Sequence, residues 1–204
     1  MPHWHALTSC ITQQPGTISR EERRRIRRED LPWRLQCFCM DEVTIRSARL
    51  PEDLDQICDL YAETVDWHAE NWPADFRKVD TRGSVREGLS HADGKSGLHV
   101  LVAEADRGRL AGLVAGSIRP RSTQAIAPYD GPLMQVRDFV VVSASYRRRG
   151  IGAMLIGRLE QLAHQDGAVA ITLHVHSQNE TAGSFCQQQG FRPVQVETRK
   201  DITP

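Results

Sequence analysis

The chain has 204 residues, of which 40% are hydrophobic and 25% charged, and its 26 Lys and Arg balance 26 Asp and Glu. This length suits one domain with an additional segment, and the zero net charge disfavours nucleic acid as a partner. No apolar run approaches the roughly 20 residues of a membrane-spanning helix, so we predict no membrane partner.

The cysteines and the N-terminus bear on cellular location. Residues 1–5 lack the cationic start and the apolar stretch of a signal peptide. The five cysteines are odd in number and irregularly spaced, which argues against a disulfide framework and fits a reducing compartment. We therefore expect a cytoplasmic location.

Residues 1–42 differ from the rest of the chain. The stretch 20–30 carries six arginines and four acidic residues, a local charge of only +2. Ile26 is its only apolar residue, so a helix here has no apolar stripe to bury. We predict a poorly ordered charged appendage over 1–42 and a single domain over 43–204. Nucleic-acid binding by the arginines is a weaker alternative.

The first part of the domain predicts a strand, helical segments and a hairpin. Residues 43–46 alternate like a strand, and Pro51 precedes an amphipathic helix that runs through Tyr61. Helical or loop structure follows at 67–73, where Pro73 limits continuation, and another turn is expected at 85–90. Residues 98–104 and 110–118 predict two strands joined as a hairpin.

The second part alternates strands and helices after a long loop at 119–132. We predict strands at 134–142, 170–176 and 193–198, with helices at 150–165 and about 179–189. An antiparallel first half and a βαβ-like second half predict an α/β fold, in which helices cover both faces of a mixed sheet of about six to seven strands.

The segment Arg147-Arg148-Arg149-Gly150-Ile151-Gly152 stands between a predicted strand and a predicted helix. This placement gathers unpaired backbone N–H groups at the positive end of a helix dipole, where they can bind a phosphate or pyrophosphate. A dinucleotide-binding G-x-G-x-x-G pattern needs glycine where Leu155 stands, and no P-loop pattern occurs. The simpler alternative is a glycine-containing turn with solvated arginines.

These residues resemble the GNAT superfamily of acetyltransferases, whose acetyl-CoA loop has the pattern [QR]-x-x-G-x-[GA]. Arg147, Gly150 and Gly152 match it. A second match begins at Asn179 and runs to Phe191, resembling the family's N-x-x-A-x-x-[FL]-Y-x-x-x-G-F segment. The resemblance spans about residues 43–199.

The resemblance implies that the strands 134–142 and 170–176 splay apart around the pantetheine arm of acetyl-CoA. It implies cofactor contacts from three places: the end of the first strand, the loop that begins the helix at 150, and the start of the helix at 179. The residues are Val140, Val141, Val142, Arg147, Arg148, Arg149, Gly150, Ile151, Gly152 and Asn179. Asn179 is equally well explained as a helix cap.

The catalytic candidates are Asp138 and Cys186. The family transfers acetyl directly to an amine, a carboxylate or water takes the proton, and a tyrosine protonates the departing thiolate. Asp138, in an otherwise apolar strand, is the candidate general base, or it pairs with Arg137. It lies one residue out of the family's spacing, which a bulge would absorb. Cys186 replaces the tyrosine and is either an acid or a small buried helix residue.

The acceptor remains open between a small amine, an amino acid, an antibiotic and a protein amino group. Aromatic and polar residues between 67 and 76 lie where the family places an acceptor-facing segment, or they are core aromatics: Trp67, His68, Glu70, Trp72 and Phe76. We predict no metal, because His174 and His176 lack a third ligand. The alternative function is a non-catalytic acyl-CoA sensor. A homodimer through a sheet edge or the aromatic segment is compatible with the sequence.

Overall fold

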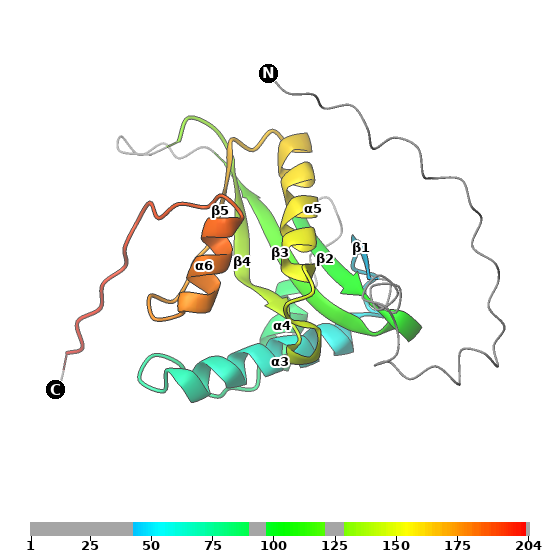
Figure 1. Ribbon diagram of the computed structural model, residues 1–204, viewed down its shortest axis with the longest axis horizontal. Helices are drawn as coiled ribbons and strands as arrows, with labels where there is room; N and C mark the ends of the chain where they lie inside the picture. The colour runs from blue at the N-terminus through cyan, green and yellow to red at the C-terminus, as the bar shows by residue number, and fades with distance from the viewer. Residues whose placement is uncertain (1–42, 90–96, 121–128, 203–204) are drawn as a thin grey trace, which may run out of the picture. The chain divides into compact units, whose positions relative to one another are not determined.

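The computed structural model describes residues 43–89, 97–120 and 129–202, so the predicted appendage at 1–42 lies outside the described residues. Figure 1 shows the elements, which follow in chain order: β1 (Thr44–Ser47), α3 (Leu54–Asn71), α4 (Arg82–Leu89), β2 (Leu98–Glu104), β3 (Leu110–Arg119), β4 (Leu133–Val142), α5 (Ile151–Gln165), β5 (Ala170–Thr172) and α6 (Glu180–Gln188). Within these ranges no helix has the length and apolar character needed to cross a membrane.

The strands form a mixed sheet in the order β1-β2-β3-β4-β5. The pairs from β1 to β4 are antiparallel, and β4 pairs with β5 in parallel. The predicted hairpin of 98–104 and 110–118 is confirmed as β2 and β3. The α/β fold with a mixed sheet is likewise confirmed.

Helices cover both faces of the sheet, as predicted (Figure 1). Val100 and Val102 of β2 point into the core under α3 and α4, whereas Leu101 and Ala103 point into the core under α5. Successive strand residues face opposite sides of a sheet. This explains why β2 and β3 are almost continuously apolar, rather than alternating with polar residues.

Helix α5 packs closely on β3 through two glycines. A Cβ built on Gly116 would lie 2.9 Å from both Leu159 Cδ1 and Met134 Sδ. A Cβ built on Gly112 would lie 2.5 Å from the backbone oxygen of Val141, because Gly112 pairs with Val142 across β3 and β4. Gly112 therefore allows the close approach of β3 to the end of β4.

Helix α3 is longer than the sequence predicts, because it continues without a break through residues 67–71, for which a separate helical or loop segment is predicted. Buried residues Ile57 and Tyr61 anchor its first turns in the core, and buried His68 continues the same face. The helix ends at Asn71, two residues before Pro73, which agrees with the restriction that proline imposes on the residue before it.

A buried ion pair fixes β1 to the start of α3. The Arg46 guanidinium donates to both carboxylate oxygens of Asp53, at 2.6 and 3.0 Å, and to the carboxylate of Glu104 on β2. The backbone N–H of Arg49 donates to Asp53 at 2.6 Å. Asp53 is only 5% exposed, and its hydrogen bonds from Arg46 lower its pKa.

The C-terminal part departs from the prediction. Residues 193–198 form no strand, and β5 ends at Thr172 instead of reaching His176. Val194 and Val196 alternate as a strand would, but they are 55% and 81% exposed, and Pro193 removes one backbone donor. Alternation alone does not make a strand, since a strand requires a partner.

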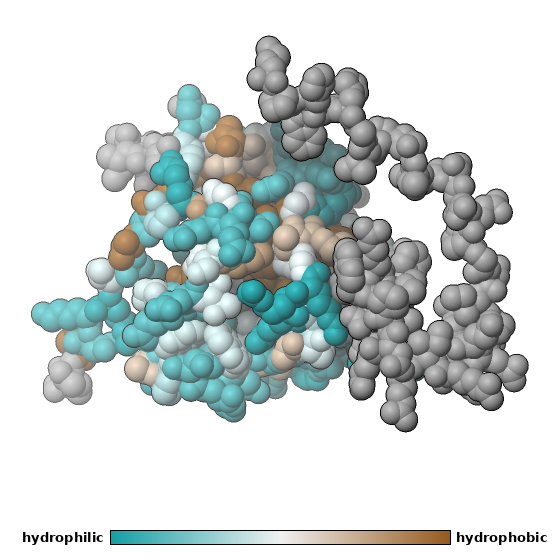
Figure 2. Space-filling model, in the orientation of Figure 1, coloured by the Kyte–Doolittle hydropathy of each residue, from teal (hydrophilic) through white to brown (hydrophobic). Residues whose placement is uncertain are grey.

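The face of the molecule shown in Figure 2 is mostly hydrophilic, with apolar residues in small separate patches.

Candidate functional site

The predicted phosphate loop lies between β4 and α5. A 3-10 turn over Ala144–Tyr146 leaves β4, and residues 147–150 are exposed. Arg148 and Gly150 adopt left-handed backbone conformations, with φ of 64° and 79°, and Gly150 caps α5. A Cβ at Gly150 would contact nothing within 4 Å. There is thus open space beside Gly150 at the start of α5, the helix end at which anions bind.

The arginines of this loop hold its backbone as well as carrying charge. Arg147 Nε donates to the Val142 carbonyl at 3.1 Å, and Arg149 donates to the Ser145 carbonyl at 3.1 Å. Arg149 also lies 5.1 Å from the ring centre of buried Tyr146. The side chains of Arg147 and Arg149 therefore help to fix the shape of the loop that precedes α5.

Helix α3 supports the loop through Glu63, which the sequence analysis did not identify. The backbone N–H of Ala144 donates to Glu63 Oε1 at 2.7 Å, and Arg147 lies 3.9 Å from the same oxygen. One turn further along α3, Trp67 lies under the Arg147 guanidinium at 5.8 Å. These contacts join residues of α3 to residues about 80 positions later in the chain, so no local sequence pattern predicts them.

The sheet opens between β4 and β5, as the resemblance implied. Their pairing covers only Leu133 to Gln135, and β4 continues without β5 to Val142. On the other side, Val114 of β3 pairs with Val140 while Ala115 pairs with Arg137. Residues 138 and 139 form a two-residue bulge in β4, whereas the one-residue offset of Asp138 calls for a bulge of one residue. The Asp138 side chain lies outside the described residues.

The predicted strand residues differ in how far they are exposed. Val141 is buried under α3, whereas Val140 and Val142 are half-buried. Along β4 the backbone groups that do not bond to β3 face the opening. These are the groups that a ligand added like a strand would contact.

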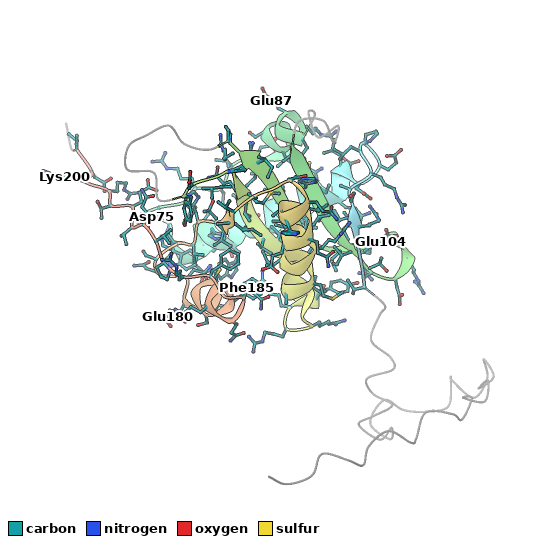
Figure 3. All side chains as sticks on the ribbon, turned by 90° about the horizontal axis from the view of Figure 1, so that it is seen from above. Asp75, Glu87, Glu104, Glu180, Phe185 and Lys200 are labelled. Atoms are coloured by element: carbon teal, nitrogen blue, oxygen red, sulfur yellow. The ribbon has the colours of Figure 1, made fainter. Side chains whose placement is uncertain are left out.

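Helix α6 places two of the predicted residues. Asn179 Oδ1 accepts a hydrogen bond from the backbone N–H of Ala182 at 3.0 Å, so Asn179 caps the helix. This is the second of the two interpretations given for this residue; its contact with the cofactor stays a prediction. Cys186 is 9% exposed, and burial raises the pKa of its thiol. Phe185 lies between α6 and α5 in Figure 3, where a Cβ on Gly152 would approach its Cζ to 3.1 Å.

Most of the predicted acceptor-facing residues form one aromatic cluster, defined as Trp67, His68, Trp72, Phe76 and His176. Trp72 lies 5.1 Å from Trp67 and 4.5 Å from His176, measured between ring centres. Glu70 does not join them, because it pairs with exposed Lys78 at 2.7 Å. The sequence did not predict that His176 and its partner Asp75 belong to this region, because the two residues are 101 positions apart in the chain.

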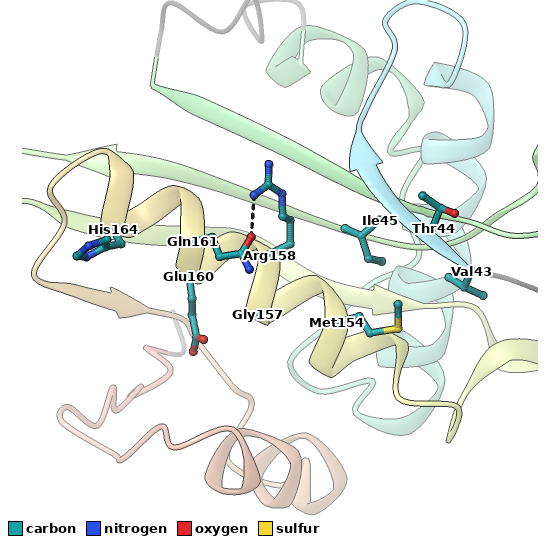
Figure 4. A pocket seen from close by; sticks show the side chains of 9 residues that line it. All are labelled: Val43, Thr44, Ile45, Met154, Gly157, Arg158, Glu160, Gln161 and His164. Atoms are coloured by element: carbon teal, nitrogen blue, oxygen red, sulfur yellow. Dashed lines mark hydrogen bonds between the residues drawn. The ribbon is translucent and has the colours of Figure 1, made fainter. Parts of the chain in front are cut away.

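A separate open groove lies between β1 and α5 (Figure 4). Its lining includes Ile45, Met154 and Arg158, and Arg158 donates to Gln161 at 2.8 Å. None of the predicted site residues lines it. Across the described ranges, no group of three or more His, Cys, Asp or Glu side chains is arranged to hold a metal ion.

Comparison with known proteins gives one family. Residues 58–191 match the model of the acetyltransferase (GNAT) family. GCN5-related N-acetyltransferase 4, chloroplastic, of Arabidopsis thaliana is 35% identical over 91 residues, which are 42% of this chain and 31% of that protein. The match thus covers about a third of that relative.

Solved structures share the fold at low identity. A mutant of the BH1408 protein from Bacillus halodurans has a TM-score of 0.69 and 17% identity, over 78% of this chain and 99% of that one. AAC(6')-Iy, in complex with the bisubstrate analogue CoA-S-monomethyl-acetylneamine, has a TM-score of 0.57 and 21% identity, over 79% and 99%.

Proposed function

Because the chain belongs to the GNAT acetyltransferase family, we propose that it transfers an acetyl group from acetyl-CoA directly to a primary amine. The loop from Arg147 to Gly152, which opens α5 beside the gap between β4 and β5, is the observation that carries this proposal. A structural neighbour that binds a CoA bisubstrate analogue on the same fold supports it.

In this proposal the pyrophosphate binds the first N–H groups of α5, at Ile151 and Gly152, with Arg147, Arg148 and Arg149 around it. The pantetheine arm lies along β4 and bonds to those backbone groups of the segment Val140, Val141 and Val142 that do not pair with β3. The bulge at 138–139 bends β4 at the point where this contact begins.

The chemistry needs a group that removes a proton from the amine and a source of a proton for the departing thiolate. Asp138 stays a candidate for the first role. Cys186 stands at the position of the family's tyrosine but is only 9% exposed, as a side chain that packs a helix is. We propose that Cys186 packs α6, and that the thiolate takes the proton carried by the attacking amine nitrogen.

Acetyl-CoA binding tests the cofactor site directly. We expect Gly150→Glu to weaken binding by at least about 100-fold in calorimetry, since it sets a carboxylate against the pyrophosphate. Gly157→Glu is the matched control, because Gly157 lies two turns along α5 and a Cβ there also meets nothing within 4 Å. Gly150→Asn controls for the left-handed backbone, which asparagine tolerates. Equal binding by all four proteins would refute the site.

Thiol release then distinguishes the enzyme from the sensor that the missing tyrosine leaves open. The intact protein is incubated with acetyl-CoA and a panel of primary amines, beginning with benzylamine. Amine-dependent release of CoA supports the transferase. Tight acetyl-CoA binding without release for any amine supports the sensor.

Asn179→Asp separates the two roles of Asn179. Aspartate caps a helix as well as asparagine does, so we expect a free energy of unfolding within about 0.5 kcal/mol of the parent. The change removes the Nδ2 donors and adds a negative charge, so acetyl-CoA affinity should fall about tenfold. Asn179→Ala, in contrast, should lose about 1 kcal/mol of stability. Unchanged affinity in Asn179→Asp would leave the residue as a cap alone.

We further propose that the protein works in a reducing compartment such as the cytoplasm, where the buried free thiols of Cys58 and Cys186 persist. A homodimer and the absence of a bound metal remain proposals of the same kind. Size-exclusion chromatography with light scattering and elemental analysis of the purified protein test them.

A further inference from the structure

The imidazole of His176 lies against two aromatic rings. Its ring centre lies 4.5 Å from that of Trp72 and 5.2 Å from that of Phe76. Its side chain is 16% exposed. Histidine is thus fixed at the point where the chain leaves β5 and turns toward α6.

Asp75 determines which nitrogen of the neutral ring carries the proton. Asp75 Oδ2 lies 3.1 Å from His176 Nε2, and Arg199 lies 3.0 Å from Asp75 Oδ1. A carboxylate only accepts, so the Nε2–H donates to it. Nδ1 is then an unprotonated acceptor.

His176 Nδ1 is buried and has no hydrogen-bond partner among the described residues. Leaving a buried polar atom unpaired is unfavourable, so such atoms are few in folded proteins and often have a functional explanation. A lone pair kept free beside a carboxylate-oriented ring is the arrangement of a general base.

The position of His176 agrees with such a role. His176 lies four residues after Thr172, in the stretch that leads from the end of β5, where it has separated from β4, to helix α6. The aromatic cluster also reaches the cofactor loop, because Trp67 contacts both Trp72 and the Arg147 guanidinium. Through Trp72 and Trp67, His176 is therefore connected to the proposed cofactor loop.

We propose that His176 is the general base of the acetyl transfer, that Asp75 is its positioning residue, and that the aromatic cluster forms a wall of the acceptor site. This rests on the proposed function. Nδ1 takes a proton from the acceptor ammonium, and the free amine attacks the thioester carbonyl. The C–S bond breaks, the thiolate takes the second amine proton, and the imidazolium beside Asp75 releases its proton to solvent.

The acceptor reaches Nδ1 by displacing part of its aromatic cover. Trp72 and Phe76 are half-buried and belong to the connection between α3 and α4, which has no regular structure from 73 to 81 apart from one turn. The aromatic rings of the cluster suit an acceptor that carries an ammonium group. In Figure 3 Asp75 lies on the side of the molecule where the C-terminal segment runs, and Arg199 of that segment is the cation now paired with it.

The test compares an amine that must lose a proton with one that need not. Benzylamine is an ammonium ion at neutral pH, whereas aniline, of similar shape, is already neutral. We expect His176→Gln to lower kcat/KM about 100-fold for the alkylamine and much less for aniline, with acetyl-CoA binding unchanged. Asp75→Asn should also lower kcat/KM more for benzylamine than for aniline, but by a smaller factor. His174→Gln is the matched control, two residues away and exposed.

The outcomes separate the two proposals. If the parent protein releases no CoA with any amine, the proposed function fails. If the parent protein acetylates amines and His176→Gln lowers kcat/KM equally for both amines, or leaves kcat/KM unchanged, His176 is not the base. His176→Phe, which keeps the ring packing, replaces the glutamine variant should that variant unfold. Nitrogen NMR of the histidine rings gives an independent test: a protonated Nδ1 in the neutral ring of His176 would overturn the proposal.

Discussion

Replacing Arg46 by methionine is expected to lower the free energy of unfolding by about 3 kcal/mol. Among the described residues, the change leaves the buried Asp53 carboxylate with the backbone N–H of Arg49 as its one donor, and Glu104 loses its partner across β1 and β2. Removing one member of a buried ion pair lowers the free energy of unfolding by more than the pair itself contributes, because the remaining charge stays desolvated without a partner. Urea denaturation measures the difference.

An exposed arginine with two carboxylate partners provides the control. Arg82 pairs with Asp59 and lies 4.0 Å from Asp55, and its side chain is 49% exposed. Arg82→Met should lower stability by no more than about 1 kcal/mol. Equal losses for the two variants would contradict the buried-charge explanation.

The same ion pair predicts a pH dependence with a definite sign. The pKa of Asp53 is lower in the folded protein than the roughly 3.9 of an unfolded chain. Its ion pair therefore stabilises the fold above about pH 4, and this contribution disappears as pH falls through the lower folded value. The stability difference between the parent and Arg46→Met should consequently shrink in acid.

Gly112→Ala should damage both the fold and the cofactor site. The new methyl group meets the Val141 carbonyl oxygen at 2.5 Å, and backbone cannot move aside as a side chain can. We expect a loss of about 2 kcal/mol in stability. Because the displaced strand is the one proposed to hold pantetheine, acetyl-CoA affinity should fall at least about tenfold in calorimetry.

Gly116→Ala is the matched control on the same strand. Its methyl group meets Leu159 Cδ1 and Met134 Sδ, which are the ends of flexible side chains. We expect a smaller loss of stability and unchanged acetyl-CoA affinity. If the two variants bind acetyl-CoA equally well, the end of β4 does not contribute to the cofactor site.

The sequence predicted best those parts of the fold that depend on neighbouring residues. The helix α5 and the cap at Asn179 follow from local periodicity and capping chemistry, and both are found. The end of α3 was placed too early, since the sequence alone did not show that His68 continues its buried face. The strand at 193–198 was wrong, because an alternating pattern does not reveal whether a partner strand is present.

In the candidate site, too, the features formed by neighbouring residues were predicted, and those that join distant residues were not. The loop from Arg147 to Gly152 is contiguous in sequence, so its pattern was visible. Glu63 supports that loop from 81 residues away, and Asp75 meets His176 across 101 residues. Such pairings depend on how α3 crosses the sheet. The aromatic residues around 72 indicated the region, but nothing in the sequence indicated the pairing.

The early separation of β5 from β4 has an energetic consequence for the whole protein. Beyond Gln135, the groups of β4 that face β5 receive no ladder hydrogen bonds from it. A ligand chain lying there would complete the ladder as a missing strand does. Folding and cofactor binding are then linked equilibria, so the measured stability of this protein should depend on the acetyl-CoA concentration at which it is measured.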